Sequence, residues 1–256
     1  MSVHPIAAGG FAAAAPTYAR IRPTYARGAV GAVADLARRR TGRARVVDVA
    51  AGTGILTGQL ARLGLDCTAV EPLAPMARQL RLALPVTPVV HGSAEALPFA
   101  ADSFQLYTAA QAFHWFDAPS ALAEAARVLA SGGDLALLFN VRDQTVPWVR
   151  ELTSLVEERT GGRPYSDHGS SRWSEVVAAS GRFGPLTEQR FANPVPTDVA
   201  GVLERLRSTS FVASLATPER EQLLDDAAAL LASHPELSGR FEYPHQTVLY
   251  LCTTAD

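Results

Sequence analysis

The 256-residue chain contains no lysine, so all 23 of its basic residues are arginine. This absence excludes Schiff-base chemistry and any phosphate-binding loop that depends on a lysine. The chain has only two cysteines, Cys67 and Cys252, which is too few for a disulfide framework or a thiolate-rich metal site. No cluster of His, Cys, Asp and Glu has metal-ligand spacing. We therefore expect no metal and a reducing, cytoplasmic environment.

The chain also lacks an excess of charge of one sign and lacks long apolar runs. The 23 basic and 25 acidic residues give a net charge of -2 and a pI near 6.3, so we expect no nucleic-acid partner. No run approaches the roughly 18 consecutive apolar residues of a membrane-spanning helix. The small apolar stretch at 7–15 has no basic residue before it, which is unlike a signal peptide. We therefore expect no secretion and no membrane partner.

Strand-like and helix-like segments alternate over the first 140 residues. Apolar runs predict strands at 45–50, 66–70, 87–90, 103–109 and 134–139, and helical spacing predicts helices at 30–40, 55–63, 74–83 and 120–129. Such alternation predicts a parallel sheet with helices on both faces. Further along, the same patterns predict helices at 148–159, 198–209 and 218–233 and strands at 186–192 and 245–252. The tail therefore adds two strands and a helical insertion.

Small residues and two carboxylates follow the first two predicted strands. Asp48 ends the first strand, the loop 50–54 carries Gly52 and Gly54, and Glu71 ends the second strand. Ligands of open α/β sheets bind beyond the carboxyl ends of the strands, where a carboxylate can accept both hydrogen bonds of a ribose diol. A dinucleotide fingerprint would need glycine where Thr57 stands, which disfavours an NAD-dependent oxidoreductase. Glu71 taken alone also fits a solvated or helix-capping acid.

Taken together, Asp48, the loop 50–54, Glu71 and the segment 92–99 resemble class I S-adenosylmethionine-dependent methyltransferases, in particular the methyltransferase type 11 family. The segment 103–116 resembles the fourth strand of that family and its following loop. Arg127-Val-Leu129 with Gly132-Gly133 resembles the approach to its fifth strand, and Tyr18 to Tyr25 its N-terminal arm. The resemblance covers residues 18 to 140.

The resemblance implies an α/β fold of Rossmann-like, doubly wound type, with a mostly parallel seven-stranded sheet and a helical lid insertion. Residues 1–40 would form an arm over the cofactor, 41–145 the cofactor-binding core, and 146–256 the rest of the sheet with a lid at 195–240. The implied reaction is methyl transfer from S-adenosyl-L-methionine to an O, N or C atom of a small organic acceptor, releasing S-adenosyl-L-homocysteine. A protein of this fold that binds the cofactor without transferring the methyl group is the alternative.

The cofactor contacts that the resemblance implies come from the arm, the strand ends and the segment after the third strand. They are Tyr18, Arg22, Tyr25, Asp48, Ala50, Ala51, Gly52, Thr53, Gly54, Glu71, Pro72, Met76, Ser93, Ala94, Glu95, Ala110 and Gln111. Two positions depart from the family pattern. Ala50 replaces the first glycine of the loop, which is tolerable if its φ is not positive. Ser93 stands where relatives often have an aspartate that holds the adenine amino group.

His114 is the candidate catalytic residue. Its imidazole, with an ordinary pKa near 6.5, could take a proton from the acceptor, or it could pack with Trp115 and Phe116 as a pocket wall. Trp115, Phe116, Tyr165 and His168 are the candidate acceptor contacts, although a surface loop explains the last two better. The arm residues Tyr18, Arg22 and Tyr25 would either contact the cofactor or lie in solvent without a ligand contact.

Overall fold

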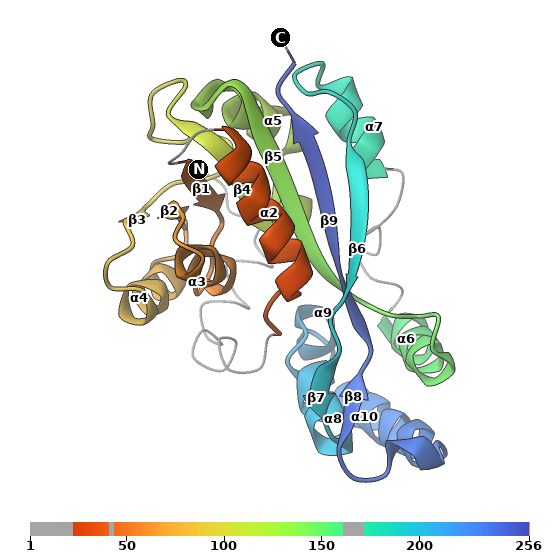
Figure 1. Ribbon diagram of the computed structural model, residues 1–256. Coiled ribbons are helices and arrows are strands. Elements are labelled where there is room, and N and C mark those ends of the chain that lie inside the picture. Colours follow the sequence, from red (N-terminus) through yellow and green to blue (C-terminus); the bar gives the residue numbers. More distant parts are fainter. Residues whose placement is uncertain (1–22, 41–43, 161–171, 256) are drawn as a thin grey trace. The chain divides into compact units, whose positions relative to one another are not determined.

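The computed structural model describes residues 23–40, 44–160 and 172–255 (Figure 1). The chain divides into two compact units. Unit 1 comprises residues 1–139, 169–191 and 247–256, and unit 2 comprises 140–168 and 192–246. Four predicted site residues, Tyr18, Arg22, Tyr165 and His168, lie outside the described residues.

A seven-stranded sheet forms the centre of unit 1, in the order β3-β2-β1-β4-β5-β9-β6. The strands are β1 (Arg45–Val49), β2 (Asp66–Val70), β3 (Val89–Val90), β4 (Phe104–Ala110), β5 (Leu129–Arg142), β6 (Thr187–Ala192) and β9 (His245–Thr253). The pairs β1/β2, β1/β4, β2/β3 and β4/β5 are parallel. The last residues of β5 and β6 and the first residues of β9 belong to unit 2.

β9 runs against its neighbours. The amide of Thr254 donates to the carbonyl oxygen of Gly133 at 2.9 Å, which places the end of β9 beside the start of β5 (Figure 1). On the other side, the amide of Gly184 donates to the carbonyl oxygen of Thr253 at 2.8 Å, just before β6 begins. β9 is therefore antiparallel to both strands. The predicted doubly wound, mostly parallel seven-stranded sheet is confirmed.

The helices of unit 1 bury small and branched side chains against this sheet. They are α2 (Arg27–Arg40), α3 (Ile55–Arg62), α4 (Ala74–Ala83), the 3-10 helix η1 (Phe113–Trp115), α5 (Ala118–Val128) and α7 (Arg172–Ala179). Leu56 and Leu60 of α3 pack in one cluster with Val33 of α2 and Val46 of β1. Four of the five residues of β1 are buried, as a central parallel strand requires.

Unit 2 is a small helical body with a two-stranded sheet. Its elements are α6 (Pro147–Thr160), β7 (Val195–Thr197), α8 (Val199–Arg207), α9 (Ser210–Ala213), α10 (Thr217–Ala232), the 3-10 helix η2 (Pro235–Leu237) and β8 (Phe241–Tyr243). Trp148, Leu206, Leu223 and Tyr243 lie in one buried cluster, and β7 pairs antiparallel with β8. The three helices expected in the tail are confirmed as α6, α8 and α10. None of the described helices is long and apolar enough to cross a membrane.

Candidate functional site

The carboxyl ends of β1, β2 and β4 meet at one edge of the sheet, because the three strands are parallel and in register. Val49 pairs with Val70, and Asp48 pairs with Thr108. The chain passes from β1 to β2 on one side of β1, while β4 lies on the other side, so this edge is the topological switch point. Ligands of open α/β sheets bind at such a point. The loop 50–54 and Glu71 both lie there.

Glu71 joins the two loops that follow β1 and β2. Its Oε2 accepts a hydrogen bond from the Gly52 amide and its Oε1 accepts one from the Leu73 amide, both at 2.8 Å. The side chain is 3% exposed, and this burial raises the pKa of Glu71, while the two amide hydrogen bonds lower it in part. The carboxylate therefore fixes where the loop after β1 lies.

The surroundings of Glu71 fit a nucleoside. A carboxylate has about four acceptor positions, and the two amides use two of them, so two are left for the hydroxyls of a ribose diol. At Gly52, where φ is +60°, a Cβ atom would meet nothing within 4 Å. The backbone beside the carboxylate is therefore open to the close approach of a ligand. The ribose role expected for Glu71 stays a prediction.

Asp48 lies beneath the loop rather than on its surface. It is fully buried, its Oδ2 accepts from the Thr57 hydroxyl at 2.5 Å, and its Oδ1 accepts from the Thr108 hydroxyl at 2.9 Å. Burial raises the pKa of Asp48 to about 6, although these hydrogen bonds oppose the rise. The carboxyl group ties β1 to α3 and β4. In the sequence, Thr57 served only as evidence against an NAD-binding fingerprint. In the structure its hydroxyl is a hydrogen-bond partner of Asp48.

Two non-glycine residues at this edge have left-handed backbones. Ala50, directly after β1, has φ of 54°, and Gln111, directly after β4, has φ of 52°. Such a conformation costs an L-residue with a Cβ roughly 1–2 kcal/mol. Strained backbone gathers at functional sites, and these two residues follow the neighbouring strands of the switch point. The condition under which Ala50 would replace glycine without cost is therefore not met.

Glycine is needed at the end of the loop. Gly54 has φ of 86°, and a Cβ atom there would lie 2.9 Å from Cγ of Leu80 in α4. The amide of Gly54 donates to the carbonyl oxygen of Ala51 at 2.9 Å, and the Ala51 amide donates to that of Val70 at 3.0 Å. The loop is thus closed on itself and held to the end of β2. Thr53, the remaining predicted residue of the loop, is buried.

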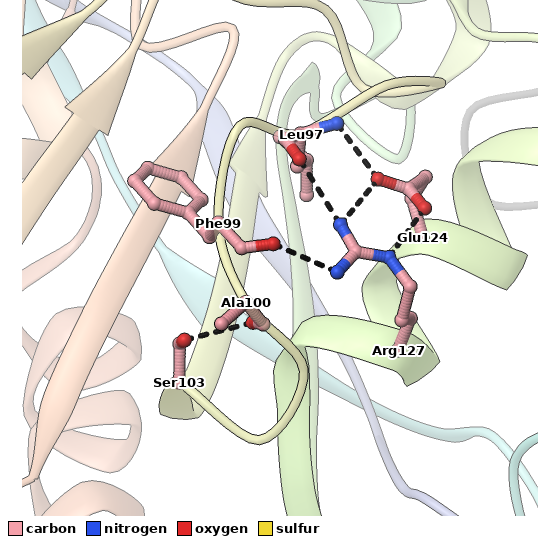
Figure 2. Close-up of polar contacts among 6 residues, drawn as sticks. All are labelled: Leu97, Phe99, Ala100, Ser103, Glu124 and Arg127. Carbon is pink, nitrogen blue, oxygen red and sulfur yellow. Dashed lines mark hydrogen bonds and ion pairs between the residues drawn. The ribbon is translucent and has the colours of Figure 1, made fainter.

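An ion pair on α5 holds the end of the segment 92–99 (Figure 2). Arg127 donates from Nη1 to the carbonyl oxygen of Phe99 at 2.7 Å and from Nη2 to that of Leu97 at 3.0 Å. Its Nε donates to Oε1 of Glu124 at 2.7 Å, and Oε2 of Glu124 accepts from the Leu97 amide at 2.7 Å. We call Glu124 and Arg127 the α5 clamp. Arg127 was interpreted from the sequence only as marking the approach to β5. Glu124 was not used there, although its position three residues before Arg127 on a predicted helix indicates an ion pair.

The residues expected at the adenine end precede this clamped stretch. Ser93 is half-buried and forms an isolated bridge with Ala96, while Ala94 is buried. Oε1 of Glu95 accepts from the Asp117 amide at 3.1 Å, just before α5 begins. The segment is therefore joined to α5 both by Glu95 and by the α5 clamp. Adenine contacts from Ser93, Ala94 and Glu95 stay a prediction.

His114 lies among aromatic rings in η1, three residues after Gln111. Its ring centroid is 4.8 Å from that of Trp115 and 6.1 Å from that of Phe139, and all of His114, Trp115 and Phe116 are half-buried. Phe116 is in edge contact with Phe113, at 5.8 Å between centroids. The three predicted residues thus form one aromatic group after β4. The role of His114 as a base stays a prediction.

Two expected cofactor contacts have their side chains in hydrophobic packing. Tyr25 is 6% exposed within the cluster of α2, α3 and β1, and Gln59 of α3 holds its backbone by hydrogen bonds at 3.0 and 2.8 Å. Met76 is 3% exposed on the buried face of α4. Pro72 lies between Glu71 and Leu73 and is half-buried, and Ala110 ends β4 and packs partly against the core. Tyr25 and Met76 thus pack in the core of unit 1, and their contact with the cofactor stays a prediction.

Both cysteines are free thiols within unit 1. Cys67 of β2 and Cys252 of β9 are buried, and burial raises the pKa of each thiol to about 12. Across the described ranges, no group of three or more His, Cys, Asp or Glu residues is placed to hold a metal ion.

Comparison with known proteins identifies the class. A family model described as a methyltransferase domain matches residues 47–137. An uncharacterized methyltransferase of Mycobacterium tuberculosis is 34% identical over 247 residues, which cover 96% of each chain. Among solved structures, a putative type II methyltransferase from Anaeromyxobacter dehalogenans has a TM-score of 0.62 at 22% identity, covering 91% of this chain and 97% of that one.

A solved N-methyltransferase from Haemonchus contortus, in complex with phosphomonomethylethanolamine and S-adenosylhomocysteine, has a TM-score of 0.61 at 14% identity. The match covers 100% of this chain and 61% of that one. The fold is that of a Rossmann-like methyltransferase. The chain belongs to the methyltransferase domain family whose model it matches, which confirms the membership that the sequence motifs predicted.

Proposed function

We propose that the chain transfers a methyl group from S-adenosyl-L-methionine to an O, N or C atom of a small organic acceptor. The observation that supports this proposal most is the Glu71 carboxylate, fixed by the Gly52 and Leu73 amides at the switch point with two acceptor positions left for a ribose diol. The near-neutral charge of the chain favours a small molecule over nucleic acid as the acceptor.

When bound, the cofactor supplies an electrophilic methyl group whose leaving group needs no acid. The residues of this chain then have three tasks. Glu71 and the loop 50–54 orient the nucleoside, and Ser93, Ala94 and Glu95 contact the adenine. His114, Trp115 and Phe116 exclude water from the acceptor. Where the acceptor must lose a proton, the imidazole of His114 is the group that takes it.

Calorimetry tests the cofactor assignment directly. The protein is titrated with S-adenosylmethionine, S-adenosylhomocysteine and NAD in parallel, and we expect binding of the first two alone. Binding of NAD, or of none of the three, would contradict the proposal. Release of S-adenosylhomocysteine across a panel of acceptors then tests transfer, and binding without any release would favour the protein that binds the cofactor but does not methylate.

The role of Glu71 needs a comparison that separates ribose binding from loop stability. Both of its oxygens accept from amides, so a Glu71→Gln side chain must turn its NH2 group toward one N–H and lose that hydrogen bond. We therefore measure S-adenosylhomocysteine against its 2′-deoxy analogue in both proteins. The unchanged protein should prefer the ribose form by about 10- to 100-fold, the value of a charge-assisted hydrogen bond. In Glu71→Gln the preference should fall toward one, and an unchanged ratio would contradict the assignment.

His114→Gln distinguishes the two roles of His114. As a base, the residue affects turnover, so kcat should fall while the affinity for S-adenosylhomocysteine stays the same. If His114 only packs with Trp115 and Phe139, the affinity for the cofactor should fall instead. The pH profile of kcat adds a second measurement, since loss of a base removes the rise of kcat around its pKa.

A further inference from the structure

Unit 2 gathers two arginines around a buried aromatic pair. The Asp143 amide donates to the carbonyl oxygen of Pro244 at 3.0 Å, so Arg142, at the end of β5, lies across from His245, at the start of β9. The His245 ring is 4.4 Å from that of Tyr243 in β8, between centroids. Cζ of Arg205 in α8 lies 5.8 Å from the centroid of the Tyr243 ring. The guanidinium of Arg205 thus lies near the Tyr243 ring, and the charge of Arg142 acts on His245 from the neighbouring strand.

Two donors in this group are buried without a partner. Within the described part of the chain, neither Nη1 of Arg142 nor the hydroxyl oxygen of Tyr243 has a hydrogen bond, and both atoms are buried. The Tyr243 side chain as a whole is 1% exposed. Leaving a buried donor unsatisfied costs roughly 1–3 kcal/mol, and more for a charged group, so proteins rarely retain one without a reason. A ligand that accepts these hydrogen bonds is such a reason.

The charge around the pair is positive. Nδ1 of His245 lies 3.0 Å from the carbonyl oxygen of Tyr243, which can only accept, so Nδ1 carries the proton of this bond. Burial, together with the charges of Arg205 and Arg142, lowers the pKa of His245 to about 4, although its hydrogen bond to Tyr243 opposes the fall. The imidazole is therefore neutral at pH 7. The charges that act on it are cations, which favours an anion as the ligand.

We propose that unit 2 contains a binding site for the carboxylate or phosphate group of a small molecule, in which Arg142 and Tyr243 donate hydrogen bonds and Arg205 supplies a second positive charge. Arginine suits this task because its planar fork of donors matches the two oxygens of a carboxylate or phosphate. The unpartnered donors of Arg142 and Tyr243 set the chemistry of the ligand. The site belongs to unit 2 alone, so it is measured without the cofactor and stands or falls independently of methyl transfer.

Binding of simple anions tests the site. Succinate and inorganic phosphate are titrated into the full chain in Tris–chloride at constant ionic strength, with succinamide as the neutral counterpart. We expect saturable binding of at least one anion and none of succinamide, and the stronger anion identifies whether the ligand group is a carboxylate or a phosphate. Arg142→Gln should weaken binding at least tenfold, and Tyr243→Phe about threefold to tenfold. Arg150→Gln, at an exposed arginine of α6, is the matched control and should bind as the unchanged protein does.

Melting temperatures separate this role from a structural one. Without anion, Arg142→Gln and Tyr243→Phe remove donors that have no partner, so neither variant should melt below the unchanged protein. With anion, the unchanged protein and Arg150→Gln should gain stability, and the two site variants should gain little. The proposal is overturned if no anion binds the unchanged protein, if Arg150→Gln loses as much affinity as Arg142→Gln, or if both site variants melt lower without anion.

Discussion

Replacing Asp48 by asparagine should make the protein more stable at neutral pH. Burial raises the pKa of Asp48 from 3.8 to about 6, so the folded protein at pH 7 carries a charge that its surroundings disfavour. The difference of about two pKa units, at 1.36 kcal/mol each, amounts to about 3 kcal/mol. The neutral amide avoids this cost at every pH.

The hydrogen bonds of Asp48 survive the replacement. The asparagine Oδ1 can accept from the Thr57 hydroxyl on one side. Its Nδ2 can donate to Oγ1 of Thr108, which is free to turn its own proton to the carbonyl oxygen of Val47, 3.4 Å away. At pH 7, Asp48→Asn therefore exchanges a charged network for a neutral one, and no buried donor is left without an acceptor.

The sign of the change in stability with pH follows from the direction of each pKa shift. Between pH 4 and 6 the folded state holds the Asp48 proton and the unfolded state has lost it, so this group contributes stability that is lost as pH rises through 6. His245 acts in the opposite sense, because its pKa is lowered to about 4 and the stability it contributes is lost as pH falls from 6.5 toward 4. The wild-type curve contains both effects, and the difference between wild type and Asp48→Asn isolates Asp48.

The assay is urea unfolding of both proteins from pH 4 to 8. The free energies of unfolding should agree near pH 4, and Asp48→Asn should exceed wild type by about 3 kcal/mol at pH 8. Asp35→Asn is the control, because it removes a carboxylate from an α2 side chain that is 64% exposed and should show no such gain. An Asp48→Asn protein that is no more stable than wild type at pH 8, or a difference that does not change with pH, would refute the reasoning.

Ala50→Gly should raise the free energy of unfolding by about 1 kcal/mol, because glycine adopts a φ of 54° without the Cβ clash; chemical denaturation measures this, and a loss of stability would contradict it. Arg127→Gln removes four charged hydrogen bonds of the α5 clamp and should cost about 2 kcal/mol. Limited proteolysis should then cut the segment 92–99 faster, and an unchanged cleavage rate would count against the clamp. In an NMR titration His245 should titrate near pH 4, whereas His234, whose pKa is raised by the Glu151 carboxylate, should titrate above 6.5; the reverse order would be inconsistent with the two environments.

The sequence predicted the first half of unit 1 well because buried parallel strands and amphipathic helices leave strong local patterns. The strand at 66–70 and the helix at 74–83 coincide with β2 and α4. α7 was missed because its eight residues are too few for a clear helical period. The strands β7 and β8 were missed because each has three residues, and their pairing joins positions far apart in the chain. The division into two units depends on long-range contacts that no local pattern contains.

Some features of the candidate site could likewise be predicted from the sequence, and others could not. The positions of Glu71 and of the loop 50–54 followed from the ends of two predicted strands. The left-handed backbones of Ala50 and Gln111 could not be read from residue types, because neither is a residue that favours positive φ. The burial of Tyr25 and Met76 could not be read from the sequence either, because it depends on how α2 and α4 pack.

The two buried thiols can be used to measure local opening of the sheet. Cys67 lies in β2, one strand from the switch point, and Cys252 lies in β9, near the other side of the same sheet. A thiol reagent can react only when a strand is transiently exposed, so the two labelling rates report the free energies of opening at two places in unit 1. A cofactor that binds at the carboxyl ends of β1 and β2 should slow the labelling of Cys67 more than that of Cys252. The chain can therefore show, without any added probe, which part of its sheet a ligand holds closed.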